Sequence, residues 1–428
     1  MIRPMQAPPT YLETLRAHPG FRYLFGARLV SLTGDWLSML AVIALLREVK
    51  GTDAGALSGF FILKLLPIFL AGPLAGVFAD RFSRRRIMLG SDLIRSVIIL
   101  ALLFAPYVGR PVVYIYALVL LQVVASAFFE PARSAALPQL VSRRHLATAN
   151  ALGALMWSTV FAVGAALGGV ITDLAGWRVA LVVDAGTYLL SAALITRIQL
   201  PPRPPRPKVK ATWKTISGWA DLSEAIRFVW GRPDVATVLF LKLGWGLAGA
   251  VTLFLTMFGE RVYVIQGRPD LSVAMLFTAR AIGTGFGPWI ARRFLRDESG
   301  TTMRRMLTLC FVWASLWYFA FSFVSTIWTA ALCVTIAHLG GSIIWVYSTV
   351  LVQRMVPDGF LGRVASADLG FATLSISVSV GLFGWLIATE FGDLRMLVRL
   401  MAISLLIPTL IWFLSARRWP VGTPAENK

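Results

Sequence analysis

Several ionisable side chains lie inside stretches that are otherwise apolar enough to be embedded in a membrane. A charge in hydrocarbon is costly, so such side chains usually face a protein interior or a water-filled cavity and mark ion or substrate pathways. Burial of a carboxylate favours its protonated form, and this suits a proton carrier. We therefore expect proton or substrate coupling to involve Arg28, Asp35, Asp184 and His338.

Asp35 is the leading candidate of this group. It lies about halfway along its apolar stretch, and Arg28 precedes it by two helical turns. We expect Asp35 to carry protons or to couple substrate movement. The alternative is a structural ion pair of Asp35 with Arg28, Lys64 or Lys242.

The remaining intramembrane groups have two interpretations each. His338 is either a proton relay or a hydrogen-bonded packing residue, and the second is the more usual role of a lone membrane histidine. Lys64, Lys242 and Arg280 add positive charge to the predicted interior. Together they favour an anionic or zwitterionic ligand, although a lysine also reaches the membrane surface through its long stem.

A second charged group lies in a short connection between two apolar stretches, where residues 72–86 read GPLAGVFADRFSRRR. Asp80 and Arg84 are four residues apart, so they face each other if the segment is helical. Glu130, at the end of a later apolar stretch, is placed to accept a hydrogen bond from one of the arginines. We expect a latch made of Gly76, Asp80, Arg81, Arg84, Arg85 and Glu130. The alternative is that the arginines only set topology.

The composition defines the elements that must position these residues. The chain of 428 residues is 57% hydrophobic and 14% charged, with a mean hydropathy of +0.72, which excludes an ordinary soluble protein. Apolar runs near the roughly 20 residues needed to cross a bilayer recur along it, and backbone in lipid must be helical. We predict an all-α membrane protein with twelve transmembrane helices near 22–46, 56–79, 87–108, 112–130, 148–172, 177–198, 235–258, 271–291, 305–326, 327–350, 365–389 and 396–416.

The net charge of +20 reflects the orientation of the loops relative to the membrane. Most basic residues fall in alternate loops, and few lie on the opposite face: Arg47, Lys50, Arg110, Arg178, Arg261, Arg268 and Arg395. By the positive-inside rule both termini are cytoplasmic, and no nucleic-acid partner is expected. Cys310 and Cys333 fall within predicted helices, where we expect packing rather than a disulfide or a metal site.

The one long polar interruption divides the chain into halves of six helices each. It begins with PPRPPRPKVK and continues with apolar residues at helical spacing near 216–229, which predicts an amphipathic surface helix. The expected organisation is a bundle over 1–199, a cytoplasmic linker over 200–234 and a second bundle over 235–428. Gly72-Pro73 has a counterpart in Gly287-Pro288, which favours an internal duplication.

The connection after the second helix resembles the signature of the major facilitator superfamily, Gly-x-x-x-Asp-Arg-x-Gly-Arg-Arg. It runs here from Gly76 to Arg85, with Ser83 where the pattern has glycine. Other stretches resemble the bacterial branch of drug, macrolide and siderophore exporters: Ser31-x-x-Gly34-Asp35, Asp92-x-x-Arg95, FFEPARSAALPQLV with Ala149-Asn150-Ala151-Leu152, Val356-Pro357-Asp358 and Gly362-Arg363-Val364.

A third pattern lies in the fifth predicted helix. Gly164, Gly168 and Gly169 resemble an antiporter-associated glycine motif, with Ala165 in place of its proline. Glycines at this spacing let a membrane helix approach its neighbour closely. We expect these three residues to be packing sites.

The resemblance implies two six-helix bundles working by alternating access, with helices 1, 4, 7 and 10 lining the cavity and the motif aspartate meeting the start of helix 11. It implies a monomeric secondary transporter of the bacterial cytoplasmic (inner) membrane, without enzymatic activity or a cofactor. The expected function is proton-coupled efflux of amphipathic drug-like molecules or a siderophore. The alternatives are an importer or lysophospholipid transporter on the same fold, and a non-transporting membrane sensor or scaffold.

Overall fold

The computed structural model describes residues 9–201, 219–294 and 300–418. Side chains are described for these residues except 70–81, 219–222, 294, 300–301, 358–359 and 416–418. Asp80, Gly76 and Arg81 of the expected latch, and most of the proline-rich linker, therefore lie outside the side chains described.

The first half of the chain consists of helices joined by short connections, and the first helix begins at Tyr11. Thr10 caps its first helix, because its hydroxyl accepts from the backbone of Glu13 while the Glu13 carboxylate accepts from Thr10. The elements are α1 (Tyr11–Ala17), α2 (Pro19–Lys50), α3 (Ala54–Arg81), α4 (Arg84–Ala101), the 3-10 helix η1 (Leu102–Tyr107), α5 (Pro111–Leu140), the 3-10 helix η2 (Arg143–His145) and α6 (Leu146–Thr196).

Helix α6 contains two of the expected membrane segments in one continuous element. Its single break is Gly176, with φ 83° and ψ 159°. A positive φ costs a side-chain-bearing residue energy, and glycine adopts it freely. The break falls between the expected segments 148–172 and 177–198, so glycine marks the change of direction that a loop was expected to make.

The second half has more interruptions. Its elements are α8 (Trp219–Trp230), α9 (Pro233–Trp245), the 3-10 helix η3 (Gly246–Ala250), α10 (Val251–Arg261), α11 (Pro269–Phe294), α12 (Gly300–Phe321), α13 (Ile327–Met355), α14 (Asp358–Ala388), α15 (Leu394–Ser404) and α16 (Leu406–Arg418). The seventh expected helix is thus α9, η3 and α10 in series, and the twelfth is α15 followed by α16.

The prediction of an all-α membrane protein is confirmed. The structure is helical over each of the twelve expected segments, within a few residues. In the described part of the chain, 8 helices are long and apolar enough to cross a membrane by length and composition. One of these spans Arg143–Thr196 and includes both segments that meet at Gly176. The full count of twelve spans stays a prediction.

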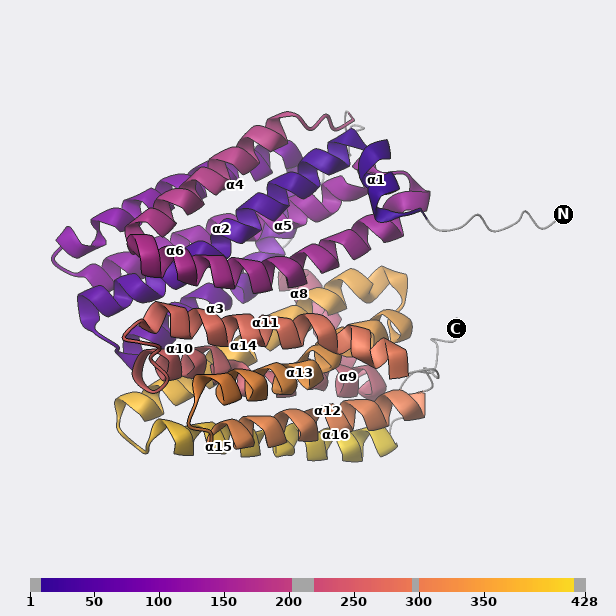
Figure 1. The fold of residues 1–428 in the computed structure, drawn as a ribbon. Coiled ribbons are helices and arrows are strands. Elements are labelled where there is room, and N and C mark those ends of the chain that lie inside the picture. Colours follow the sequence, from indigo (N-terminus) through magenta and orange to yellow (C-terminus); the bar gives the residue numbers. More distant parts are fainter. Residues whose placement is uncertain (1–8, 202–218, 295–299, 419–428) are drawn as a thin grey trace.

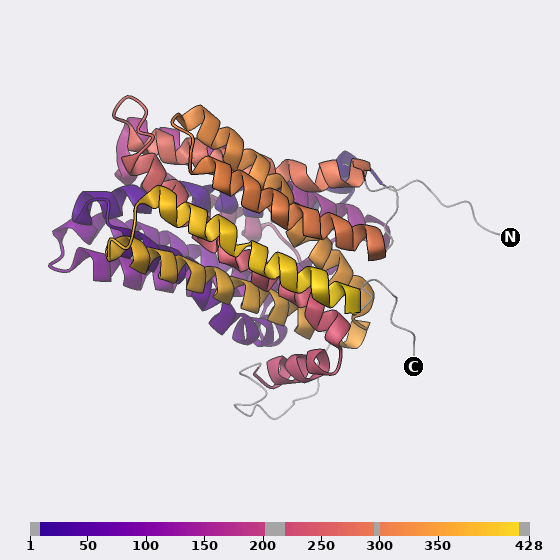
Figure 2. The same ribbon diagram turned by 90° about the horizontal axis from the view of Figure 1, so that it is seen from below.

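The helices form two groups that lie side by side, α1–α6 and α9–α16 (Figure 1). The groups pack against each other mainly through α6 with α11 and α3 with α14. Helix α8 lies at one end, against the start of α14 (Figure 2). The Phe228 and Phe360 rings stack there at 4.6 Å, and Arg363 pairs with Glu224 at 3.2 Å.

The three glycines of the expected packing motif all lie at close helix contacts. A Cβ at Gly164 would lie 2.9 Å from the Trp36 Cβ, and one at Gly168 would lie 3.1 Å from the Leu37 Cα, both on α2. A Cβ at Gly169 would lie only 2.0 Å from the Ala274 Cβ on α11. Small residues therefore hold α6 against α2 within its own group and against α11 in the other.

Candidate functional site: a central cavity and its charged walls

A cavity of about 1220 Å³ lies between the two groups of helices. Its wall comes from α2, α3 and α5 on one side and from the α9–α10 series and α14 on the other, with single residues from α6, α11 and α13. The expected helices 1, 4, 7 and 10 all contribute, helix 10 only through His338, and α3 and α14 line the cavity as extensively as helices 1, 4 and 7. Its ionisable lining residues are Arg28, Asp35, Lys64, Glu130, Arg280, His338 and Arg363.

The cavity extends toward the end of the molecule where α8 lies. Glu130 and Arg363 line it there, and their side chains are 47% and 37% exposed. On α2 the lining ends at Met39, two turns before Arg47. The cavity therefore reaches the surface at the α8 end and stops short of the opposite end.

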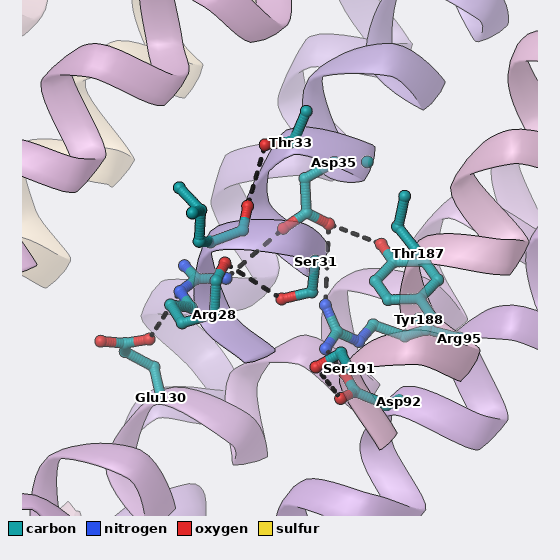
Figure 3. A network of polar contacts seen from close by, with 12 residues as sticks. Arg28, Ser31, Thr33, Asp35, Asp92, Arg95, Glu130, Thr187, Tyr188 and Ser191 are labelled. Carbon is teal, nitrogen blue, oxygen red and sulfur yellow. Dashed lines mark hydrogen bonds and ion pairs between the residues drawn. The ribbon is translucent and has the colours of Figure 1, made fainter. Parts of the chain in front are cut away.

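Asp35 lies in the cavity wall with three polar partners, as Figure 3 shows. Its Oδ2 is 3.5 Å from Arg28 Nη1, and its Oδ1 is 3.6 Å from Arg95 Nη1. The Tyr188 hydroxyl donates to Oδ1 at 2.5 Å. The structural pair with Arg28 is thus present, but among the described contacts neither Lys64 nor Lys242 pairs with Asp35.

Arg95 was missed as a site residue by the sequence reasoning. It is fully buried on α4, where it pairs with Asp92 one turn earlier, and Ser191 donates to the other oxygen of Asp92 at 2.6 Å. Its guanidinium also lies 4.3 Å from the centre of the Tyr188 ring. Two opposite charges three residues apart inside an apolar helix are a signal that could have revealed it.

A chain of hydrogen bonds leads from Asp35 along the same wall. Gln122 of α5 donates to the Tyr188 hydroxyl at 3.1 Å, and Lys64 of α3 donates to Gln122 at 3.2 Å. Tyr188 thus donates to Asp35 and accepts from Gln122. The chain connects a cavity carboxylate to a cavity ammonium group through four helices.

Glu130 has other partners than those expected of it. It pairs with Arg133 on its own helix and with Arg28 at 3.5 Å. Arg84 donates to the Ala135 carbonyl at 2.6 Å, and Arg85 donates to the carbonyl oxygens at the end of α6. In the contacts of described side chains, Glu130 therefore belongs to the Asp35 network through Arg28, and the expected bond to an arginine of the α3–α4 connection is not among them.

Asp184 lies apart from the cavity wall. It is fully buried on α6 and accepts from Thr187 at 3.1 Å. A Cβ at Gly34 would lie 2.1 Å from its Oδ1, so the backbone of α2 passes directly over the carboxylate. Among the described side chains it forms no ion pair within 4.0 Å.

His338 stands between two polar groups in the second half. Arg280 Nε donates to His338 Nε2 at 2.9 Å, and the Tyr318 hydroxyl is 2.6 Å from Nδ1. A guanidinium is always a donor, so Nε2 must accept and the imidazole is neutral with its proton on Nδ1. His338 therefore accepts from the cavity arginine and cannot hold a second proton while that bond exists.

Lys242 is not a free interior charge, contrary to the expectation. It forms a buried ion pair with Asp368 of α14. Its ammonium group also lies 5.1 Å from the centre of the Trp345 ring. The pair joins α9 to α14 within the second half, so Lys242 offers no net charge to a ligand.

The end of the molecule opposite α8 is closed by polar bonds between the two halves. Arg47 of α2 bridges Glu260 at 3.0 Å and Asp270 at 2.6 Å. Arg268 pairs with Asp173 at 3.4 Å. The Glu260 side chain is fully buried, and Arg47 is 24% exposed. Sequence reasoning had treated Arg47 only as a marker of topology.

No group of three or more potential metal ligands gathers among the residues that the structure describes. Both cysteines are buried and unpaired by a disulfide. The polar chemistry of the described interior therefore consists of ion pairs and hydrogen bonds.

Comparison with known proteins shows the family to which this architecture belongs. The profile described as Major Facilitator Superfamily matches residues 24–367. The chain belongs to this superfamily. YfiS of Bacillus subtilis (strain 168), named an uncharacterized MFS-type transporter, is 24% identical over 382 residues, which cover 84% of this chain and 85% of that protein. The protein is accordingly a multi-pass membrane transporter and not an enzyme.

Two further likenesses bear on the same conclusion. The multidrug efflux pump Tap of Mycobacterium bovis (strain BCG / Pasteur 1173P2) is 29% identical over 236 residues, covering 53% of this chain and 54% of that one. The crystal structure of a bacterial homologue of the human lysosomal transporter Spinster, inward-facing and unoccupied, superposes with a TM-score of 0.68 at 15% identity, covering 94% and 98% of the two chains. At that identity the second likeness shows the fold alone, and it confirms the predicted major facilitator fold.

Proposed function

We propose that this transporter exports amphipathic drug-like molecules or a siderophore from the bacterial cytoplasm in exchange for protons. It acts as a monomer in the cytoplasmic membrane, with both termini inside. The α8 end then faces the cytoplasm, and the cavity faces inward. Substrate enters beside Glu130 and Arg363, and the bonds of Arg47 keep the outer end closed.

One observation carries the proposal: Asp35 stands in the cavity wall with arginines from two different helices on its two oxygens. As a carboxylate it attracts both Arg28 and Arg95. A proton on Asp35 removes that attraction, so the two protonation states favour different placements of α2 relative to α4. A ligand or proton that binds two arrangements unequally shifts their populations. Asp35 thereby couples proton binding to the shape of the cavity.

Efflux is supported by the state of the cavity and by one relative. The cavity reaches the proposed cytoplasmic end, where a compound from the cytosol or the inner leaflet enters. The partial likeness to Tap, whose name records multidrug efflux, favours the same direction.

The latch at the α3–α4 connection remains part of this proposal. Arg84 and Arg85 bind the start of α4 to α5 and α6 within one half. We therefore assign to Asp80 the contact between the halves that breaks when the cytoplasmic end opens. Replacing Asp80 by Asn is expected to abolish transport while the protein still inserts into the membrane. Unchanged transport by that variant rules out the latch.

Everted membrane vesicles test the proposed function. A pH gradient is imposed, and a panel of cationic, neutral and anionic amphiphiles is added to vesicles with wild-type protein or with the Asp35→Asn variant. Antiport predicts that some members of the panel collapse the gradient with wild type and not with the variant. Uptake confined to right-side-out vesicles would show import instead, and flux in neither preparation would show a sensor or scaffold. If the Asp35→Asn variant still builds a substrate gradient driven by pH, Asp35 does not carry the coupled proton.

A further inference from the structure

The two walls of the cavity differ in how their charges are balanced. In the first half the described charges of the cavity lining are equal in number, Arg28 and Lys64 against Asp35 and Glu130, and Arg95 behind them pairs with Asp92. Lys64 has no carboxylate in direct contact, and it is joined to Asp35 through the hydrogen bonds of Gln122 and Tyr188. This wall presents no excess charge to a ligand.

The second half has an arginine that no described carboxylate matches. Lys242 is neutralised by Asp368, and Arg363, at the mouth, by Glu224. Arg280 lies deeper in the cavity, and its described partners are the neutral imidazole of His338 and, at 5.5 Å, the ring of Phe161. A charge held away from bulk water without a counter-ion is costly unless something supplies that counter-ion.

The orientation of Arg280 leaves its outer edge available. The Nε atom is used by His338, and Tyr318 fixes the imidazole from the other side. Among the described hydrogen bonds and ion pairs, none involves the two terminal nitrogens of this guanidinium. Two parallel N–H groups on a fixed plane match the two oxygens of a carboxylate or a phosphate.

Aromatic rings contact both described partners of this guanidinium. Phe161 stacks on Trp36 at 4.2 Å and meets Trp157 edge-on at 5.6 Å. Trp245 meets His338 edge-on at 6.1 Å. Trp36, Trp157 and Trp245 all line the cavity. A ligand whose charged head meets Arg280 thus rests its apolar body on indole surfaces from both halves.

We propose that the substrate is an amphipathic anion, whose carboxylate or phosphate head binds Arg280 and whose aromatic or aliphatic body packs on Trp36, Trp157 and Trp245. This rests on the proposed transport function and names its substrate class. The head supplies the counter-charge that the second half lacks. His338 is a positioning residue, since it orients Arg280 without touching the ligand.

Equilibrium binding to purified protein in nanodiscs tests the proposal, with tryptophan fluorescence as the readout. The probes share one ring body and differ in the head: naphthoate, naphthamide and naphthylmethylammonium. Lysophosphatidylglycerol and lysophosphatidylcholine form a second pair, so that a soluble organic anion is distinguished from an anionic lipid. Because binding needs neither a gradient nor transport, its outcome is independent of the vesicle experiment.

The wild type is expected to bind naphthoate about tenfold more tightly than the amide or the ammonium probe, as expected for a charge-assisted hydrogen-bond pair. Arg280→Gln is expected to remove this preference, and Arg280→Lys to retain part of it. Arg292→Gln, an exposed arginine of the same helix, is expected to behave as wild type. The ratio between probes is measured on one sample, so a partly unfolded variant does not obscure it.

Three results would overturn the proposal. They are tighter binding of the ammonium probe than of naphthoate, equal binding of all three naphthyl probes together with equal binding of the two lysophospholipids, or a preference for the anion that survives in Arg280→Gln. If only the lipid pair shows a preference for the anion, the anionic head still binds Arg280 and the substrate is a phospholipid. If vesicles show proton antiport while no anion preference exists, the substrate class is wrong and the transport function stands.

Discussion

The two halves differ in how the charges in their interiors are paired. In the first half, ion pairs and hydrogen bonds link Glu130, Arg28, Asp35, Arg95 and Asp92 into one network across α2, α4 and α5 (Figure 3). In the second half, the described charges at the cavity stand in separate places: one closed pair between α9 and α14, another between α8 and α14 at the mouth, and one arginine held by a histidine. The same fold thus carries a balanced network on one side and an unbalanced cation on the other.

This difference suggests a division of work between the halves. A balanced network changes its bonds when one member gains a proton, so it suits coupling. An unbalanced cation beside aromatic rings attracts an anion, so it suits substrate binding. The halves remain mechanically linked, since Arg47 bridges them at one end and Gly169 packs against Ala274.

The largest effect is expected from breaking the balance of the first half. Arg95→Gln leaves Asp92 buried without its cation, and loss of one partner of a buried pair costs about 3–5 kcal/mol. Thermal or denaturant unfolding in detergent measures the loss. Arg178→Gln is the control, because Arg178 and Glu48 form a pair at 3.1 Å with both side chains more than 40% exposed, and such pairs contribute at most about 1 kcal/mol. Equal losses in both variants would contradict a buried, mutually dependent network.

A smaller effect is expected where the halves touch. In Gly169→Ala the new methyl group meets Ala274 of the other half, and overpacking of this kind costs about 1–3 kcal/mol. Gly153→Ala on the same helix is the matched control, since a Cβ there meets nothing within 4 Å. Both are compared by thermal unfolding and by transport rate. A Gly169→Ala protein as stable and active as the control would show that this contact does not join the halves.

The smallest effect is expected from releasing the outer closure, because opening of that end lets water solvate the Glu260 carboxylate that loses its cation. Arg47→Gln removes the bridge to Glu260 and Asp270 and shifts the protein toward an outward-open form, by about tenfold for each 1.4 kcal/mol of lost bonding. A Met39→Cys reporter in the cavity wall measures this as faster labelling by an impermeant maleimide from the outer side.

The control for this experiment is Arg110→Gln, an exposed arginine that lies on the same face. It removes one positive charge without touching the bonds between the halves. Labelling of the reporter in Arg47→Gln at the wild-type rate would mean that other contacts alone close the outer end.

The sequence predicted most of the fold because apolar length and loop charge are local properties. Each expected membrane segment is helical, and even the join between 148–172 and 177–198 falls at Gly176. Asp35, Arg28 and His338 were selected by the cost of a charge in lipid, and all three line the cavity, whereas Asp184, selected in the same way, is not among the lining residues.

The partners could not be predicted in the same way. Asp35 and Tyr188 are 153 positions apart, and Lys242 and Asp368 are 126 apart. Helical periodicity gives the face of a helix and not the neighbour that this face meets. The sequence therefore could not separate Lys242 from Arg280 as cations available to a ligand. In the structure Asp368 neutralises Lys242, whereas Arg280 has no carboxylate partner among the described residues.

Transport of naphthoate in everted vesicles tests the division of work most directly, if it is measured both as uptake driven by an imposed pH gradient and as exchange without one. The account predicts that Asp35→Asn loses gradient-driven uptake and keeps exchange, whereas Arg280→Gln loses both. Gradient-driven uptake by Asp35→Asn, or normal exchange by Arg280→Gln, would contradict it.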